Sequence, residues 1–179
     1  MRPVSRARRV RALVALTGLV ALTGCSLQHP LDAANQSQAT VGKPAPDFSG
    51  TTLDGKALSL KDLRGHPVLL NFWASWCGPC RLEQPGLTKV AKEYEAKGLR
   101  VVGVAVRDNL NQAKIYRDEF SVPYPSIFDQ AARLEYAYQV DAPPSSVLID
   151  SSGVVRYKET GGVGEDVLKR LLADKLKLS

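Results

Sequence analysis

The feature that most constrains this chain is an apolar segment, residues 67–73, that leads almost directly into Cys77-Gly78-Pro79-Cys80. A nearly continuous apolar run is typical of a strand buried on both faces. A helix is predicted from about residue 79 to residue 97, so the second cysteine falls in its first turn. The amide dipoles there favour a thiolate on the first cysteine. This context favours a redox-active pair, although the motif alone also fits a structural disulfide or a metal clip.

The first 25 residues have the features of an export signal. Five arginines precede the first acidic residue, and an apolar run follows at residues 12–22. This run is shorter than the ~20 residues of a membrane-spanning helix and has the length of a signal-peptide core. It ends in Leu22-Thr23-Gly24-Cys25, which resembles the lipobox of bacterial lipoproteins, in which the cysteine is acylated. An ordinary signal peptide that contains a cysteine is the alternative.

Three segments are therefore expected. Residues 1–24 are predicted to be a signal peptide, residues 25–40 a flexible tether held at a membrane by lipid on Cys25, and residues 41–179 one folded domain. The tether is polar, rich in small residues and without periodicity. The expected location is the extracytoplasmic face of the cell membrane.

Charge and cysteine count narrow the function. The net charge of +6 comes mostly from the leader: without its five arginines, the other 19 of the 24 basic residues nearly balance 18 acidic ones. No basic stripe with interleaved aromatic residues remains, which argues against a nucleic-acid partner.

If Cys25 carries lipid, Cys77 and Cys80 have no other thiol to bond. A disulfide that closes so short a loop constrains the unfolded chain little, so reactivity is the better reason for the pair.

Strands alternate with helices along the rest of the chain, which indicates an α/β fold with a mixed β-sheet flanked by helices. Asp108 and Asn109 can both cap the helix that follows them. The last helix is expected to bury Val167, Leu168, Leu171, Leu172 and Leu176. The predicted elements are a β-hairpin at 51–60, a helical turn at 60–64, strands at 67–73, 99–106, 126–128, 146–150 and 154–158, and helices at 79–97, 110–120, 130–138 and 164–178.

These motifs together resemble the thioredoxin-like superfamily, specifically its membrane-tethered TlpA/ResA-type thiol:disulfide oxidoreductases. The resemblance covers about residues 41–178 and rests on the segment from Phe72 to Cys80, on Pro85 within the helix, and on the segment from Val140 to Asp150. The segment from Gly42 to Phe48 is shared with the broader redoxin group. The resemblance implies a thioredoxin-like fold, a central mixed β-sheet flanked by helices, with an N-terminal β-hairpin extension.

The resemblance also implies roles for residues near the pair. Cys77 corresponds to the exposed attacking cysteine and Cys80 to the buried resolving cysteine. Pro144 falls where the fold places a cis-proline beside the dithiol, an isomer found at ~5–6% of X-Pro bonds. The residue before it pairs with the substrate chain in the family; here that residue is Pro143, which lacks an N–H but keeps its carbonyl. Trp76 could line the docking surface, or it could simply pack on the sheet.

A candidate proton carrier lies in the first turns of the predicted helix. Thioredoxin has an aspartate beneath its cysteines, where this chain has Asn71, whereas Glu83 matches the acid of the TlpA/ResA group. A carboxyl kept partly out of water has a raised pKa and can exchange protons with the resolving thiol. The simpler alternative for Glu83 is a solvated residue that complements the helix dipole.

The activity implied is thiol–disulfide exchange without a cofactor or a metal. A Cys77 thiolate would attack a disulfide in a client protein, and Cys80 would resolve the mixed disulfide. An upstream membrane electron donor would then reduce the enzyme. Reduction is the favoured direction because Gly78-Pro79 is the dipeptide of thioredoxin, a reductant. Apocytochrome c before haem attachment is one chemically sensible client.

Other functions stay open. A thiol peroxidase of the peroxiredoxin type would have a threonine three residues before its cysteine, where this chain has Ala74. A zinc site is disfavoured because His29 and His66 are not spaced to complete it with two cysteines. Copper delivery, or non-catalytic binding by a lipid-tethered thioredoxin scaffold, is the remaining alternative.

Overall fold

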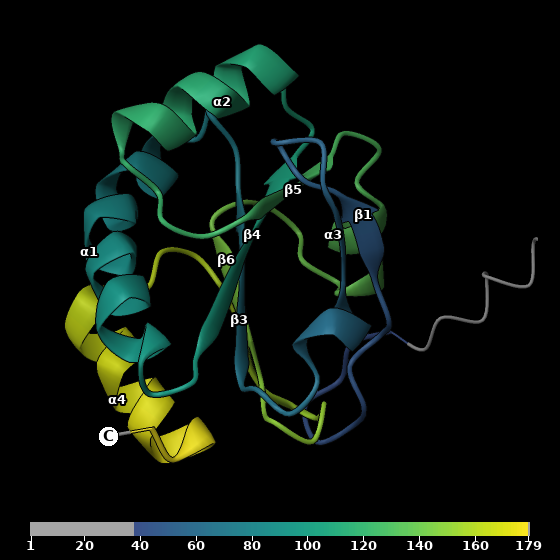
Figure 1. The fold of residues 1–179 in the computed structure, drawn as a ribbon, viewed down its shortest axis with the longest axis vertical. Helices are drawn as coiled ribbons and strands as arrows, with labels where there is room; N and C mark the ends of the chain where they lie inside the picture. Colours follow the sequence, from purple (N-terminus) through teal and green to yellow (C-terminus); the bar gives the residue numbers. More distant parts are fainter. Residues whose placement is uncertain (1–37, 179) are drawn as a thin grey trace, which may run out of the picture. The chain divides into compact units, whose positions relative to one another are not determined.

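A five-stranded mixed sheet forms the centre of the domain in the computed structural model, which describes residues 38–178 (Figure 1). The predictions for the signal peptide, Cys25, His29 and residues 25–37 of the tether lie outside these residues. The prediction that the tether extends to residue 40 is wrong: Ala39 is 1% exposed within the core, and its amide donates to the Ala137 carbonyl at 3.0 Å, so this end belongs to the folded domain. In chain order the elements are β1 (Ser49–Thr51), β2 (Ala57–Ser59), the 3₁₀ helix η2 (Leu60–Leu63), β3 (Val68–Trp73), α1 (Gly78–Glu95), β4 (Arg100–Val106), α2 (Leu110–Glu119), β5 (Ser126–Asp129), α3 (Arg133–Ala137), β6 (Ser145–Ile149), β7 (Val155–Thr160) and α4 (Glu165–Leu176).

The strand that leads to the cysteines is at the middle of this sheet, whose order is β5-β4-β3-β6-β7. β3 runs parallel to β4 and antiparallel to β6, and β5 and β7 complete the parallel and antiparallel halves. All six residues of β3 are buried, which explains its continuous apolar sequence. The redox motif therefore follows a fully buried strand at the middle of the sheet.

Helices cover both faces of the sheet (Figure 1). Successive strand residues point to opposite faces, so Leu69 joins the core beneath α1 and α4, whereas Leu70 joins the core beneath η2 and α3. α2 lies on the same face as α1, where Tyr116 packs with Trp73 and Cys80. Within residues 38–178, every helix is too short or too polar to cross a membrane.

The N-terminal hairpin of β1 and β2 lies beside the outer edge of β5. Thr52 forms a bridge with Ile127, and the Leu53 amide donates to the Ser126 carbonyl at 2.8 Å. A Cβ atom on Gly50 would come within 2.5 Å of the Ile127 side chain, so this close approach requires glycine. The hairpin thus pairs with an edge that would otherwise present free backbone groups.

The predicted fold class and hairpin extension are confirmed, and two details of the helices are wrong. The helix expected at 130–138 is reduced to α3, because Ala132 adopts a left-handed conformation and the Asp129 carboxylate accepts the first amides of the shorter helix. Val167 is 42% exposed instead of buried. It lies one position, and so about 100° around the helix, from Leu168, which faces the core.

Candidate active site

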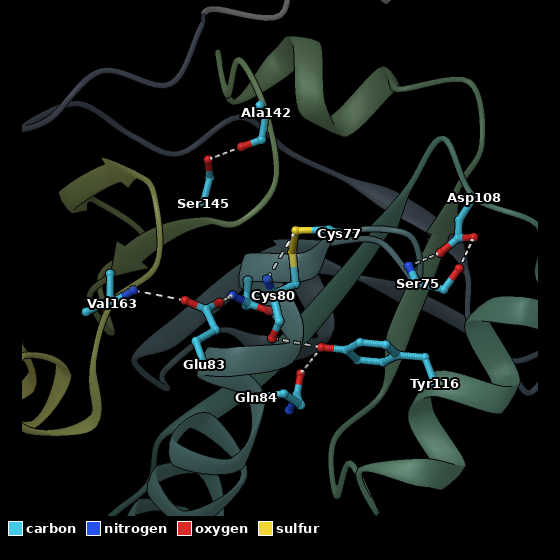
Figure 2. The surroundings of a disulfide bond; sticks show 11 residues. Ser75, Cys77, Cys80, Glu83, Gln84, Asp108, Tyr116, Ala142, Ser145 and Val163 are labelled. Atoms are coloured by element: carbon cyan, nitrogen blue, oxygen red, sulfur yellow. Dashed lines mark hydrogen bonds between the residues drawn. A yellow bond between two sulfur atoms is a disulfide. The ribbon is translucent and has the colours of Figure 1, made fainter.

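Cys77 and Cys80 form a disulfide at the N-terminus of α1. Cys77 is the N-cap residue: its backbone is extended, and its Sγ accepts a hydrogen bond from the Cys80 amide at 3.2 Å (Figure 2). Pro79 occupies one of the first helical positions, where its missing N–H would have no helical partner. Both sulfurs therefore lie where the amides of α1 favour negative charge.

Both cysteines are enclosed in this disulfide form. Cys77 is 4% exposed and Cys80 1% exposed. The prediction of an exposed first cysteine is therefore wrong for the oxidised protein, because the bond holds Cys77 against Cys80 within a cluster that also contains Trp73 and Ala74.

The predicted cis-proline is confirmed at the bond between Pro143 and Pro144. Ser145 pairs with Phe72 of β3, which places this turn at the end of the sheet that carries the cysteines. The Ser145 hydroxyl donates to the Ala142 carbonyl at 2.6 Å and closes the turn (Figure 2). Pro144 is buried and Pro143 is half-buried, so only part of this turn is open to solvent.

Glu83 extends from α1 toward β7 and the loop that follows it (Figure 2). Its Oε1 accepts a hydrogen bond from Asn71 Nδ2 at 2.8 Å, and its Oε2 accepts one from the Val163 amide at 2.9 Å. Burial raises the pKa of Glu83, and the bonds from Val163 and Asn71 limit that rise. The side chain is thus a shielded, hydrogen-bonded acid and not the solvated residue of the simpler alternative.

Trp76 is 58% exposed and does not pack on the sheet. Its Nε1 donates to the Arg107 carbonyl at 3.2 Å, and the Arg107 guanidinium lies 6.0 Å from its ring centre. Arg107 itself forms an ion pair with Glu135 at 2.7 Å. The indole is therefore an exposed surface beside Cys77 that is held in one orientation.

The turn between β4 and α2 contributes a residue that sequence reasoning assigned differently. Asn109 alone caps α2, with its side chain accepting from the Asn111 and Gln112 amides. The Asp108 carboxylate instead accepts from the Ser75 amide at 2.5 Å and the Ser75 hydroxyl at 2.7 Å (Figure 2). The available signal was an acid two residues after the end of a strand parallel to the one that leads to the cysteines, since the ends of such strands meet at one edge of the sheet.

A set of buried polar side chains, which connects α1 to α2 and to the loop after it, was also not predicted from the sequence. The Tyr116 hydroxyl lies 3.0 Å from the Cys80 carbonyl and 3.3 Å from Gln84 Oε1 (Figure 2). Gln84 Nε2 donates to the Tyr124 hydroxyl at 2.9 Å. Burial raises the pKa of Tyr116, which keeps the phenol protonated and able to donate. The ring of Tyr116 stacks on Trp73 with centres 4.4 Å apart. Nothing in the local sequence joins these distant residues.

The side chains of residues 38–178 bring no group of three histidine, cysteine or acidic residues together in a geometry that could hold a metal ion. His66 lies beside Gly98, just before β3, whereas the cysteines follow the other end of that strand. The site thus combines a disulfide at a helix N-terminus, a neighbouring cis-proline and a shielded carboxyl. This combination of groups is suited to thiol–disulfide exchange.

The sequence model of the redoxin family matches residues 40–172. The chain belongs to this family. It is 33% identical over 147 residues to the thiol-disulfide oxidoreductase ResA of Bacillus anthracis, covering 82% of this chain and 83% of that relative. It is 33% identical over 174 residues to the thiol:disulfide interchange protein DsbE of Xylella fastidiosa (strain Temecula1 / ATCC 700964), covering 92% and 87%.

Solved structures agree with these relatives. A thiol:disulfide interchange protein of the thioredoxin family from Chlorobium tepidum TLS superposes with a TM-score of 0.69 at 32% identity, over 78% of this chain and 99% of that one. This redoxin is therefore a TlpA/ResA-type thiol:disulfide oxidoreductase with a Cys77–Cys80 redox pair, and it acts on disulfide-containing substrates.

Proposed function

We propose that this redoxin is tethered to the extracytoplasmic face of the membrane and reduces disulfides in client proteins. The observation that supports the exchange chemistry most directly is Glu83, a shielded carboxyl with a raised pKa on the same helix as the redox pair. Such a group can take a proton from the resolving thiol and return it. The Gly78-Pro79 dipeptide favours reduction, because thioredoxin, which shares it, has a potential of roughly −270 mV.

In the first step the Cys77 thiolate attacks one sulfur of a client disulfide. A bond forms between Cys77 Sγ and that sulfur, and the second client sulfur leaves as a thiolate that takes up a proton. The Cys80 amide, which donates to Cys77 Sγ in the oxidised protein, stabilises the attacking thiolate. The product of this step is a mixed disulfide.

In the second step Glu83 accepts the proton of the Cys80 thiol. The Cys80 thiolate attacks Cys77 Sγ, the bond to the client breaks, and the client's first sulfur leaves as a thiolate and is protonated. Two electrons have then moved from the dithiol to the client, and the enzyme has the Cys77–Cys80 disulfide seen in the structure. An upstream membrane electron donor returns two electrons and restores the dithiol.

The client would dock across Trp76 and the turn at Pro143 and Pro144. Trp76 offers an exposed aromatic face beside Cys77. The carbonyl of Pro143 can accept a hydrogen bond from an extended client segment. Because Pro143 has no N–H to donate, it contributes only this one bond to the pairing. Both surfaces flank the disulfide, so a client cysteine between them would reach the attacking sulfur.

The N-terminal sequence supports the proposed location, and the chemistry of haem attachment supports the proposed client. We infer a signal peptide at 1–24 and a lipidated Cys25 that begins a tether at 25–37, which would keep the domain near a membrane electron donor. Apocytochrome c is a reasonable client, because haem attachment needs the two thiols of its Cys-x-x-Cys-His motif in reduced form.

The decisive test is reduction of a protein disulfide by the dithiol form. The reduced protein should reduce insulin or a disulfide-bonded apocytochrome c, and Cys77→Ser should lower the rate to that of the buffer. A Cys80→Ala variant should accumulate mixed disulfides with its clients in cells, where they can be isolated and identified. Activity that survives in Cys77→Ser, or consumption of peroxide in place of protein disulfides, would reject the proposal.

A further inference from the structure

The turn between β4 and α2 holds a buried carboxylate that the steps above do not use. Asp108 is 5% exposed. Its Oδ2 accepts from the Ser75 amide at 2.5 Å, and its Oδ1 accepts from the Ser75 hydroxyl and from the Asn109 amide, each at 2.7 Å. Asp108 makes no ion pair with a lysine or arginine of residues 38–178.

Helix capping does not account for this arrangement. A buried carboxylate without a cation is unfavourable unless hydrogen bonds offset the loss of water. The N-cap of α2 is already Asn109, whose side chain accepts two amides of the helix. Two of the three bonds to Asp108 come instead from Ser75, which belongs to the segment that carries Cys77. The carboxylate is therefore directed at the redox motif.

Ser75 lies inside a tight turn that sets the position of Cys77. The Cys77 amide donates to the Ala74 carbonyl at 3.1 Å, so this turn closes around Ser75 and Trp76. Trp76 Nε1 also donates to the carbonyl of Arg107, the residue before Asp108. Two consecutive residues after β4 thus hold the two residues that precede Cys77.

The charge of Asp108 is not balanced by the cations nearest the motif. Arg107 is paired with Glu135 at 2.7 Å, and Arg81, which follows Cys80, is paired with Glu119. Since each arginine already has its own carboxylate, the negative charge of Asp108 is offset by its three hydrogen bonds and not by a cation of residues 38–178. The nearest reactive group along the chain is Cys77, two residues after Ser75.

We propose that Asp108 is a positioning residue that holds the turn before Cys77 and whose negative charge keeps the dithiol strongly reducing. The α1 amides favour a Cys77 thiolate, and a fixed carboxylate nearby opposes it. A less stable thiolate makes the reduced form less stable, which lowers the reduction potential. The direction of this effect suits the proposed reductase, on which the inference rests.

The test is the equilibrium of each variant with glutathione at mildly alkaline pH, where two glutathione molecules reduce the disulfide and become glutathione disulfide. Asp108→Asn should shift this equilibrium toward the dithiol about fivefold, equivalent to about 20 mV. The ultraviolet absorbance of the thiolate should also show a larger thiolate fraction on Cys77. Asp108→Ser, which is neutral and smaller, should shift in the same direction if Asp108→Asn folds poorly.

Three controls separate charge from geometry. Asp108→Glu keeps the charge, and Ser75→Ala removes one hydrogen bond while leaving the carboxylate in place, so both should stay within about twofold of the unmodified protein. Asp174→Asn makes the same chemical change at an exposed site on α4 and should have no effect. An Asp108→Asn shift no larger than that of Asp174→Asn, or a Ser75→Ala shift as large as that of Asp108→Asn, would overturn the proposal.

This experiment does not need a client protein. If the reduced enzyme fails to reduce insulin or apocytochrome c, the proposed function fails while the glutathione equilibrium of each variant can still be measured. A normal client reaction combined with unchanged equilibria in the Asp108 variants would reject only the role of Asp108.

Discussion

The two carboxyl groups that approach the redox motif have different surroundings. Glu83 is on α1 itself, stays partly open to solvent, and accepts hydrogen bonds from β3 and from the loop after β7. Asp108 is on the turn before α2, is buried, and accepts two hydrogen bonds from the turn that precedes Cys77. A carboxyl with a raised pKa can exchange protons, whereas one that accepts hydrogen bonds from a loop holds the geometry of that loop.

The largest expected effect is on the step assigned to Glu83. Glu83→Gln should slow the release of client from the mixed disulfide about 100-fold, within the usual range for a lost acid–base group. The substitution should be tolerated structurally. Oδ1 of Asn71 has no hydrogen-bond partner among the described residues, so the Asn71 amide can turn over and accept from the NH₂ group of the introduced side chain, while Val163 still donates to its oxygen.

Rapid quenching of a single turnover with a model disulfide would measure this step. The rate at which Cys77 is alkylated serves as an internal control, because it reports the first thiol and should change much less. Glu95→Gln, an exposed position on the same helix, is the matched control for the loss of an acid from α1. Resolution at an unchanged rate in Glu83→Gln would show that the two carboxyls do not differ in the way proposed.

Local sequence patterns were sufficient for most of the fold. The apolar run of β3 predicted a strand buried on both faces, and Cys77 to Cys80 with the following helical pattern predicted a disulfide at a helix N-terminus; both are confirmed. These features depend on residues adjacent in the chain. The start of the helix predicted at 130–138 was wrong because the Asp129 side chain, not the apolar spacing, determines where α3 begins.

The partners of the site depend on residues far apart in the sequence. Glu83 was recognised from its position in the motif, but its hydrogen-bond donor Val163 lies 80 residues later in the sequence. Asp108 was interpreted as a cap because it precedes a helix, and its true partner, Ser75, comes from another strand end. Residue types predict what a side chain can do, whereas the sheet order determines which two side chains meet.

A smaller effect, on stability, is expected from Tyr116 of α2, whose hydroxyl contacts α1. Tyr116→Phe removes the hydroxyl that lies within hydrogen-bond distance of the Cys80 carbonyl and Gln84 but keeps the ring stacked on Trp73. Loss of this buried donor should lower the free energy of unfolding by about 1–2 kcal/mol, measured by urea denaturation of the oxidised protein. Tyr136→Phe is the control, since Tyr136 is 74% exposed and should change stability little.

Because Tyr116 is on α2, the same variant also tests whether the α1 and α2 sides of the motif differ in function. If the α2 side of the motif supplies rigidity and the α1 side supplies proton transfer, Tyr116→Phe should leave the rate of mixed-disulfide resolution close to that of the unmodified protein. A loss in that rate comparable to the loss in Glu83→Gln would mean that both sides contribute to proton transfer.

The smallest effect expected is on the pH dependence of stability. Burial raises the pKa of Glu83 above its ordinary value of 4.5, so the folded protein holds this proton more tightly than the unfolded chain. Glu83 therefore contributes stability that is fully present below the ordinary value and is lost as pH rises through the raised value. Above that window the charged form is disfavoured in the folded state.

Glu83→Gln cannot ionise and should escape this loss. The free energy of unfolding of the variant relative to the unmodified protein should rise with pH across the window that begins near 4.5 and ends at the raised value, and should be level on either side. Urea denaturation of both oxidised proteins at a series of pH values measures this difference, since no free thiol of the pair titrates there. A difference that falls with pH would mean that the bonds from Asn71 and Val163 outweigh burial and that the folded protein favours the charged form of Glu83.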